Sequence, residues 1–183
     1  HTKNSTAYLK RLFLFAIISQ VPYLLVHGVH SPGSLELNIF FTLFLGLLAI
    51  ITLQRLKNRI VKVLLVVCIT LVAEQFTSGF SYGAYGVISI LIFYLFYKNI
   101  TIAVVLQALA IFVFYTLPVL LSGSTLSQLY DSRSIALIQP VALLSLFIIA
   151  FHNGKLGHKT KMFFYIFYPL HLTIIYLLMA FYF

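Results

Sequence analysis

The sequence predicts an all-α integral membrane protein, a polytopic bundle of about seven transmembrane helices. Of its 183 residues, 62% are hydrophobic and 8% are charged, whereas soluble domains carry about 25% charged residues. The mean hydropathy is +1.06, and apolar stretches recur along the whole chain. We therefore expect the lipid bilayer as its partner, and the composition argues against a soluble enzyme or a nucleic-acid partner. We expect a single transmembrane domain over residues 1–183.

The predicted helices follow from the length of a span, which is about 20 mostly apolar residues for roughly 30 Å of hydrocarbon. Seven stretches come close to that length: residues 9–26, 35–53, 60–76, 84–97, 100–121, 134–151 and 162–183. The fourth is the shortest, and Lys98 and Asn99 form a tight link to the fifth. Polar turns that contain glycine separate most of the others, at residues 30–33, 77–79, 122–124 and 152–154.

The charges predict the direction of each helix. When the spans run alternately outward and inward, eleven of the twelve Lys and Arg residues fall on one side. The other side receives Arg133 and the acidic residues Glu36, Glu74 and Asp131. Because cytoplasmic loops carry an excess of Lys and Arg, we expect a cytoplasmic N-terminus and an external C-terminus.

The loop between the second and third stretches is strongly basic, with Arg55, Lys57, Arg59 and Lys62. These residues fit two interpretations, which their spacing does not separate. As topology signals, they hold the loop in the cytoplasm. As a binding surface, they also grip anionic lipid headgroups or an anionic cofactor such as the phosphates of coenzyme A.

Polar side chains inside the predicted spans are costly in hydrocarbon and usually face a bundle interior, a partner or a cavity. Three of them lie about 14–15 Å along their helices from a basic residue, near the middle of the bilayer: Gln20, Gln107 and His171. Glu74 and Gln139 lie in the outer half. If the helices converge, these residues line one polar, substrate-binding pocket. Alternatively, each Gln forms an interhelical hydrogen bond worth about 0.6–2 kcal/mol, and Glu74 lies among lipid headgroups.

His171 is the candidate catalytic residue. It follows Pro169, which lacks an amide hydrogen and frees a backbone carbonyl one turn earlier. A neutral imidazole at this depth can accept a proton, which suits a general base; the alternative is a structural histidine that donates to a backbone carbonyl. His27 and His30 are three residues apart, but no acidic residue or cysteine completes a site, so we expect no metal.

The last inner loop and final span read FHNGKLGHKTKMFFYIFYPLHLTIIYLL. This segment is similar to the carboxy-terminal signature of the TraX family, which its Asn153-Gly154 turn and its YPLHL motif match. The segments YLKRLFLFAIISQVPY, LNIFFTLFLGLLAI and YGAYGVISILIFYLFYK resemble the family in the same order. The resemblance therefore covers nearly the whole chain, and we add Tyr168 of the YPLHL motif to the expected substrate-binding residues.

The resemblance implies a membrane acetyltransferase of the bacterial cytoplasmic (inner) membrane, because the family includes the protein that acetylates the amino terminus of F-type pilin. The acetyl donor is then acetyl-CoA, and the acceptor a pilin, another protein amino terminus or a cell-surface glycan. In this hypothesis acetyl-CoA docks at the basic loops. His171 deprotonates the acceptor, and Gln20 or Gln107 donates a hydrogen bond to the developing oxyanion.

Two other functions stay open, namely a small transporter that uses the same polar residues and a non-catalytic membrane subunit of pilus or surface-polymer assembly. Members of the family usually begin with two further spans, which contain Asp-His-x-Gly and Gly-Arg-x-x-Phe-Pro segments that are absent from this sequence. The chain begins at His1 without an initiator methionine. We therefore expect a fragment of a longer protein. If the family's Asp-His pair is the catalytic base and its orienting acid, this fragment lacks part of the active site.

Overall fold

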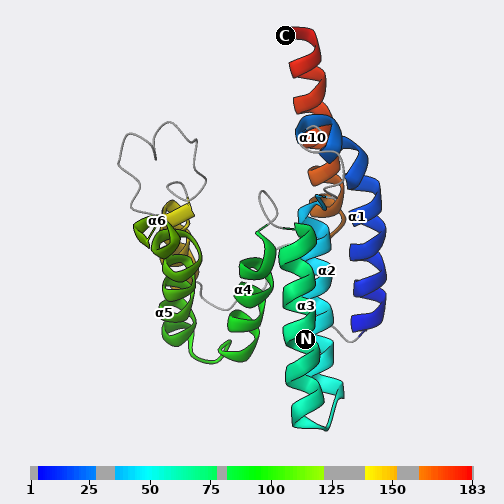
Figure 1. The fold of residues 1–183 in the computed structure, drawn as a ribbon. Coiled ribbons are helices and arrows are strands. Elements are labelled where there is room, and N and C mark those ends of the chain that lie inside the picture. The colour runs from blue at the N-terminus through cyan, green and yellow to red at the C-terminus, as the bar shows by residue number, and fades with distance from the viewer. Residues whose placement is uncertain (1–3, 28–35, 78–81, 122–138, 152–160, 183) are drawn as a thin grey trace. The chain divides into compact units, whose positions relative to one another are not determined.

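Helices make up the regular structure of the described residues, as the sequence predicts. The structure is a computed structural model and describes residues 4–27, 36–77, 82–121, 139–151 and 161–182 (Figure 1). In chain order the elements are α1 (Ser5–His27), α2 (Ile39–Arg55), α3 (Arg59–Thr77), α4 (Gly83–Leu95), α5 (Ile100–Ile111), the π-helical stretch η2 (Phe112–Thr116), α6 (Leu117–Leu121), the 3-10 turn η3 (Gln139–Ala142), α9 (Leu143–Ala150) and α10 (Lys161–Tyr182).

The helices coincide with the predicted spans, but they differ in length. Within the described ranges, four are long and apolar enough to cross a membrane: residues 5–27, 59–77, 100–121 and 162–181. α2 and α4 are apolar but have only 17 and 13 residues. Of the sixth predicted span, only residues 139–151 are described. The count of seven spans and the sides of the two termini therefore stay predictions.

Asparagine side chains begin several of the helices. The Oδ1 atoms of four asparagines accept hydrogen bonds from the first backbone amides of α1, α2, α3 and α5 in turn: Asn4, Asn38, Asn58 and Asn99. A cap of this kind contributes about 0.5–2 kcal/mol, because it satisfies an amide that has no partner within the helix. The Asn38 cap explains why α2 begins at Ile39 and not at residue 35 as predicted.

A proline shapes the long helix of residues 100–121. Pro118 has no amide hydrogen, and its ring clashes with the carbonyl four residues earlier in an α-helix. Directly before it, the chain widens into the π-helical stretch η2 and then returns to α-helix in α6. The wider turn accommodates the proline, so this span continues through it as predicted.

The chain divides into two compact units. Unit 1 consists of His1–Val87 and Gly157–Phe183 and contains α1, α2, α3 and α10; unit 2 consists of Ile88–Leu156 and contains the rest, with the greater part of α4. The prediction of a single domain over residues 1–183 stays a prediction, and the two units are described separately below.

In unit 1, α1, α2 and α3 form an antiparallel series (Figure 1). At one end, Arg55 Nη2 donates to Thr6 Oγ1 at 3.5 Å, so the end of α2 meets the start of α1. At the other end, the Leu37 amide donates to the Phe76 carbonyl at 2.8 Å, which joins the segment before α2 to the end of α3. α10 packs along α1 in the same direction, because its residues contact positions of increasing number on α1.

The core of unit 1 lies between α1, α2 and α10. Its buried residues are Leu12, Ala16, Phe40 and Tyr165. On α1 the buried positions recur every three or four residues, at 12, 16, 19 and 23, which is the stripe expected of a helix with one packed side. The other sides of α1 are apolar and exposed, as expected of surfaces that face lipid.

Candidate functional site

Asn38 is the centre of a polar cluster where α1 meets the start of α2. Its side chain is fully buried. Nδ2 donates to the Ala16 carbonyl at 2.7 Å and to Gln20 Oε1 at 2.8 Å, while Oδ1 accepts from the Phe40 amide at 3.0 Å. Every hydrogen-bonding group of this side chain is thus satisfied by the protein. The buried amide fixes α1 against the start of α2, because leaving these groups unpaired in an apolar interior is costly.

Gln20 holds the same junction from the side of α1. Its Oε1 accepts from both Nδ2 and the backbone amide of Asn38, the latter at 3.2 Å, and its Nε2 donates to the Glu36 carbonyl at 2.8 Å. One N–H of Gln20 remains for another partner. The predicted interhelical hydrogen bond is therefore present, and the role of Gln20 in substrate binding stays a prediction.

Tyr168 brings α10 to this junction. Its ring lies edge-on to Phe40, with 5.1 Å between ring centroids, and its hydroxyl lies beside the backbone of Ile39 and near Tyr23. One turn earlier, the Tyr165 ring stacks on Phe15 at 4.8 Å. Residues from α1, α2 and α10 therefore meet around the first turn of α2.

His171 lies one turn beyond Tyr168 on the same side of α10. Its Nδ1 is 3.1 Å from the Phe167 carbonyl oxygen, and its ring stacks on Phe167 at 5.1 Å and meets Tyr168 edge-on at 5.3 Å. A carbonyl oxygen only accepts, so Nδ1 carries the hydrogen and the lone pair of the neutral ring is on Nε2. Among the described residues, nothing bonds to Nε2, and the side chain is half-buried.

The polar residues that we predicted around His171 have other hydrogen-bond partners. The hydrogen bond and the ring contacts of His171 are with residues of its own helix, while Gln20 bonds to Asn38 and Glu36. The local hydrogen bond is the one predicted for a structural histidine. It is equally the bond that orients an imidazole for proton transfer at Nε2, so the catalytic assignment of His171 stays a prediction.

Glu74 lies near the end of α3 and caps the start of α4. Its Oε2 accepts from the Ala84 amide, the second residue of α4, at 2.8 Å. The chain enters α4 through two left-handed residues, Tyr82 with φ of 70° and Gly83 with φ of 46°. Glu74 is exposed, and a carboxylate at a helix N-terminus is favourable because the helix dipole is positive there.

Gln107 belongs to unit 2. Its Nε2 donates to the carbonyl and to the hydroxyl of Ser89 on α4, at 2.9 and 2.8 Å. The side chain is 1% exposed, and among the described residues Oε1 has no hydrogen-bond partner. Both N–H groups are used by Ser89, and the role of Gln107 as an oxyanion donor stays a prediction. Gln139 is in η3, and its side chain lies outside what is described.

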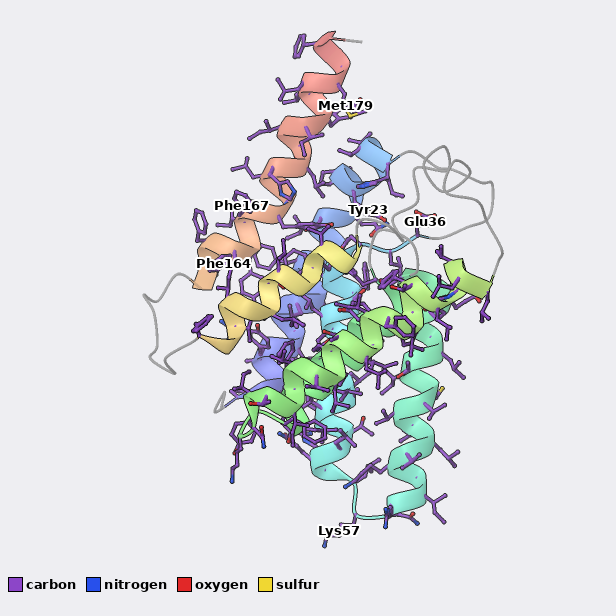
Figure 2. The ribbon with its side chains drawn as sticks, turned by 90° about the vertical axis from the view of Figure 1, so that its left-hand side faces the viewer. Tyr23, Glu36, Lys57, Phe164, Phe167 and Met179 are labelled. Carbon is purple, nitrogen blue, oxygen red and sulfur yellow. The ribbon has the colours of Figure 1, made fainter. Side chains whose placement is uncertain are left out.

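The basic residues around the turn between α2 and α3 lie at the end of α2 opposite to Asn38. Arg55, Lys57 and Arg59 are exposed and Lys62 is half-buried. Figure 2 shows Lys57 at the tip of the turn between α2 and α3, and Glu36 at the other end of these helices. The described residues do not include Asn153 and Gly154, for which the sequence predicts a turn, or the charged residues Asp131 and Arg133.

The central residue of the cluster, Asn38, is missing from the site residues predicted from sequence. A signal existed, because an asparagine directly before an apolar run is typical of a helix N-cap. Its second role, the contact with α1, depends on which helices are neighbours. Hydropathy does not contain that information.

Comparison with known proteins places these residues in a family context. A family model described as TraX protein matches residues 1–179. A relative from Dichelobacter nodosus, described as "Probable fimbrial assembly protein FimC, serogroup H1", is 27% identical over 187 residues, which cover 96% of this chain and 72% of the relative. No solved structure matches the chain significantly.

Proposed function

Because the chain belongs to the TraX family, we propose that it is an integral membrane acetyltransferase of pilus assembly that transfers an acetyl group from acetyl-CoA. The acceptor that we favour is the amino terminus of a pilin, and the alternative acceptor is a cell-surface glycan. The description of the relative as a fimbrial assembly protein supports the connection with pili. The acetyl transfer itself rests on the resemblance described above.

One structural observation supports a functional site in unit 1. Three segments that carry the resemblance, SQVPY at 19–23, LNIFF at 37–41 and YPLHL at 168–172, meet around the first turn of α2. Gln20 of the first bonds to Asn38 of the second, and Phe40 of the second contacts Tyr168 of the third. His171, the only ionisable side chain of the YPLHL motif besides Tyr168, is in ring contact with Tyr168.

In the proposed reaction, Nε2 of His171 removes a proton from the acceptor amine as the amine nitrogen attacks the acetyl carbonyl. The new C–N bond forms, the carbon–sulfur bond of the thioester breaks, and coenzyme A leaves as a thiolate that is then protonated. The Nδ1 bond to the Phe167 carbonyl supports this role, because it keeps the lone pair on Nε2. Gln20 retains one N–H for the oxyanion.

The basic residues around the turn between α2 and α3 have a long-range role in this proposal. Acetyl-CoA is strongly anionic, and exposed cations raise the local concentration of an anionic substrate. We assign this attraction to Arg55, Lys57, Arg59 and Lys62, which face the side where the positive-inside rule places the cytoplasm.

A non-catalytic subunit of pilus assembly is the second candidate. The hydrogen bond of His171 within its own helix favours it, as does the complete internal pairing of Asn38. In this alternative the junction around α2 only holds the bundle together.

Labelled acetyl-CoA distinguishes the two candidates. Membranes that contain the chain, in its full-length parent protein, are mixed with labelled acetyl-CoA and a pilin with a free amino terminus. If the protein is an acetyltransferase, label appears on the pilin amino terminus only when the chain is present. If the chain co-purifies with pilus components but transfers no label, the acetyltransferase hypothesis is contradicted and the non-catalytic subunit is supported.

A further inference from the structure

Four cations lie around the turn between α2 and α3 at one end of unit 1, which we call the basic end: Arg55, Lys57, Arg59 and Lys62. Three of them are exposed and Lys62 is half-buried. We propose that the basic end binds the phosphate groups of anionic phospholipids and thereby anchors α1, α2 and α3 to one leaflet. The proposal does not depend on the acetyltransferase reaction.

The basic end is held together by contacts between the helices. Arg55 Nη2 donates to Thr6 Oγ1 at 3.5 Å, so the end of α2 is joined to the first turn of α1, one turn before Lys10. The turn between α2 and α3 is fixed on both sides. The Leu56 amide donates to the Thr52 carbonyl, and Asn58 Oδ1 accepts from the Ile60 amide at 2.9 Å.

No carboxylate of the described part of unit 1 lies beside these cations. The whole chain has three acidic residues. Glu74 caps α4 at the far end of α3, and Glu36 lies before α2, at the end opposite to Lys57 (Figure 2). The third, Asp131, lies outside the described residues. A cluster of like charges without internal counter-charges repels itself, and anions from outside the chain relieve that repulsion.

The surroundings of the cations favour a lipid over a soluble anion. Directly after Arg59, the surface of α3 becomes apolar and exposed, with Ile60 at 71% and Leu64 at 62%. A phospholipid fits both parts of this surface at once. Its phosphate contacts Arg59 or Lys57 and its acyl chains cover Ile60 and Leu64, while the half-buried stem of Lys62 lies along the boundary. A soluble anion contacts only the cations and gains nothing from the apolar surface beside them.

The test measures lipid retention by the purified chain in neutral detergent, using native mass spectrometry. The probes are phosphatidylglycerol, which is anionic, and phosphatidylcholine, which is not. At low ionic strength we expect about tenfold stronger retention of phosphatidylglycerol, and a decrease of about fivefold in Lys57→Gln, which removes one exposed charge. Lys98→Gln is the matched control, because Lys98 is an exposed lysine in the turn between α4 and α5. It should retain phosphatidylglycerol like the parent.

Three outcomes overturn the proposal. The first is equal retention of the two lipids by the parent chain. The second is equal loss in Lys57→Gln and Lys98→Gln, since a general effect of net charge would then explain it. The third is displacement of phosphatidylglycerol by coenzyme A at equal concentration, which would make the basic end a cofactor site. If the parent protein retains phosphatidylglycerol selectively but transfers no acetyl group, only the proposed function is contradicted.

The triple variant Lys57→Gln, Arg59→Gln, Lys62→Gln should lose the selectivity entirely. Its helical content is checked by circular dichroism.

Discussion

Asn38 Nδ2 donates to Gln20 Oε1 at 2.8 Å, across 18 positions of the sequence. The same Nδ2 donates to the Ala16 carbonyl, and Oδ1 caps α2 through the Phe40 amide. One buried amide therefore determines both where α2 begins and where α1 lies against it. This makes Asn38 the most sensitive polar position that we identify in unit 1.

Replacing Asn38 by Ala should destabilise the protein by about 2–4 kcal/mol, because it removes a helix cap and leaves the oxygen of the half-buried Gln20 without one of its donors. Thermal or denaturant unfolding in detergent measures the change. Asn58→Ala is the matched control, since Asn58 caps α3 at an exposed position and should cost only about 0.5–2 kcal/mol. Equal losses in the two variants would show that the contact with α1 contributes nothing.

Hydropathy and charge predict much of this fold and little of its packing. The ends of α3 and α10 follow from where apolar residues stop, because spans must match the hydrocarbon thickness. The opposite placement of Lys57 and Glu36 also follows from sequence, through the alternation of spans. The partners of Gln20 do not, because lipid-facing and helix-facing residues are equally apolar in a membrane protein. Composition therefore locates polar residues by depth, and only the structure tells which neighbour each one contacts.

Gln107 illustrates the same limit. Its depth along α5 predicts either an interhelical bond or a place in a pocket, and the structure shows the bond, to Ser89. The direction of the amide was not predictable. It is determined by the Ser89 carbonyl, which can only accept and therefore faces Nε2 and not Oε1.

Replacing Gln107 by Leu should change the free energy of unfolding by less than about 1 kcal/mol. The variant loses the two hydrogen bonds to Ser89, which stabilise the protein by about 1 kcal/mol each. It also removes Oε1, a buried acceptor that destabilises the protein by about 1–3 kcal/mol because it has no partner among the described residues. The freed Ser89 hydroxyl can bond within its own helix. Unfolding measured beside Asn38→Leu provides the comparison, because there the loss should be several-fold larger. A large loss in Gln107→Leu would mean that Oε1 has a strong partner in the membrane.

Tyr82 enters α4 with φ of 70°, in the left-handed region that costs a residue with a Cβ about 1–2 kcal/mol. Replacing Tyr82 by Gly should therefore stabilise the protein by up to about 1 kcal/mol, after the greater flexibility of glycine in the unfolded chain is subtracted. The ring contact between Tyr82 and Tyr85, with centroids 6.3 Å apart, is lost in this variant and in the control alike. Tyr85→Gly is the control. Tyr85 lies within α4, where glycine should destabilise by about 1 kcal/mol. If both variants lose stability equally, the strain at Tyr82 has no energetic consequence.

The assignment of His171 as general base makes a sharper prediction than loss of activity. His171→Ala should lower the rate of acetyl transfer by about 10²–10⁴-fold, the usual contribution of general base catalysis. Free imidazole in the assay should restore part of the rate, because a small base can occupy the space of the missing ring and accept the proton. A purely structural histidine would not be rescued in this way.

His27 provides the matched control for this experiment. Its Nδ1 lies 3.0 Å from the Tyr23 carbonyl and its ring stacks on Tyr23 at 4.4 Å, so it repeats the local geometry of His171 on α1. His27→Ala should transfer acetyl at close to the parent rate and should not respond to imidazole. If the two variants lose activity to the same extent, and imidazole rescues neither, then both histidines only support their helices and the reacting base lies elsewhere in the protein.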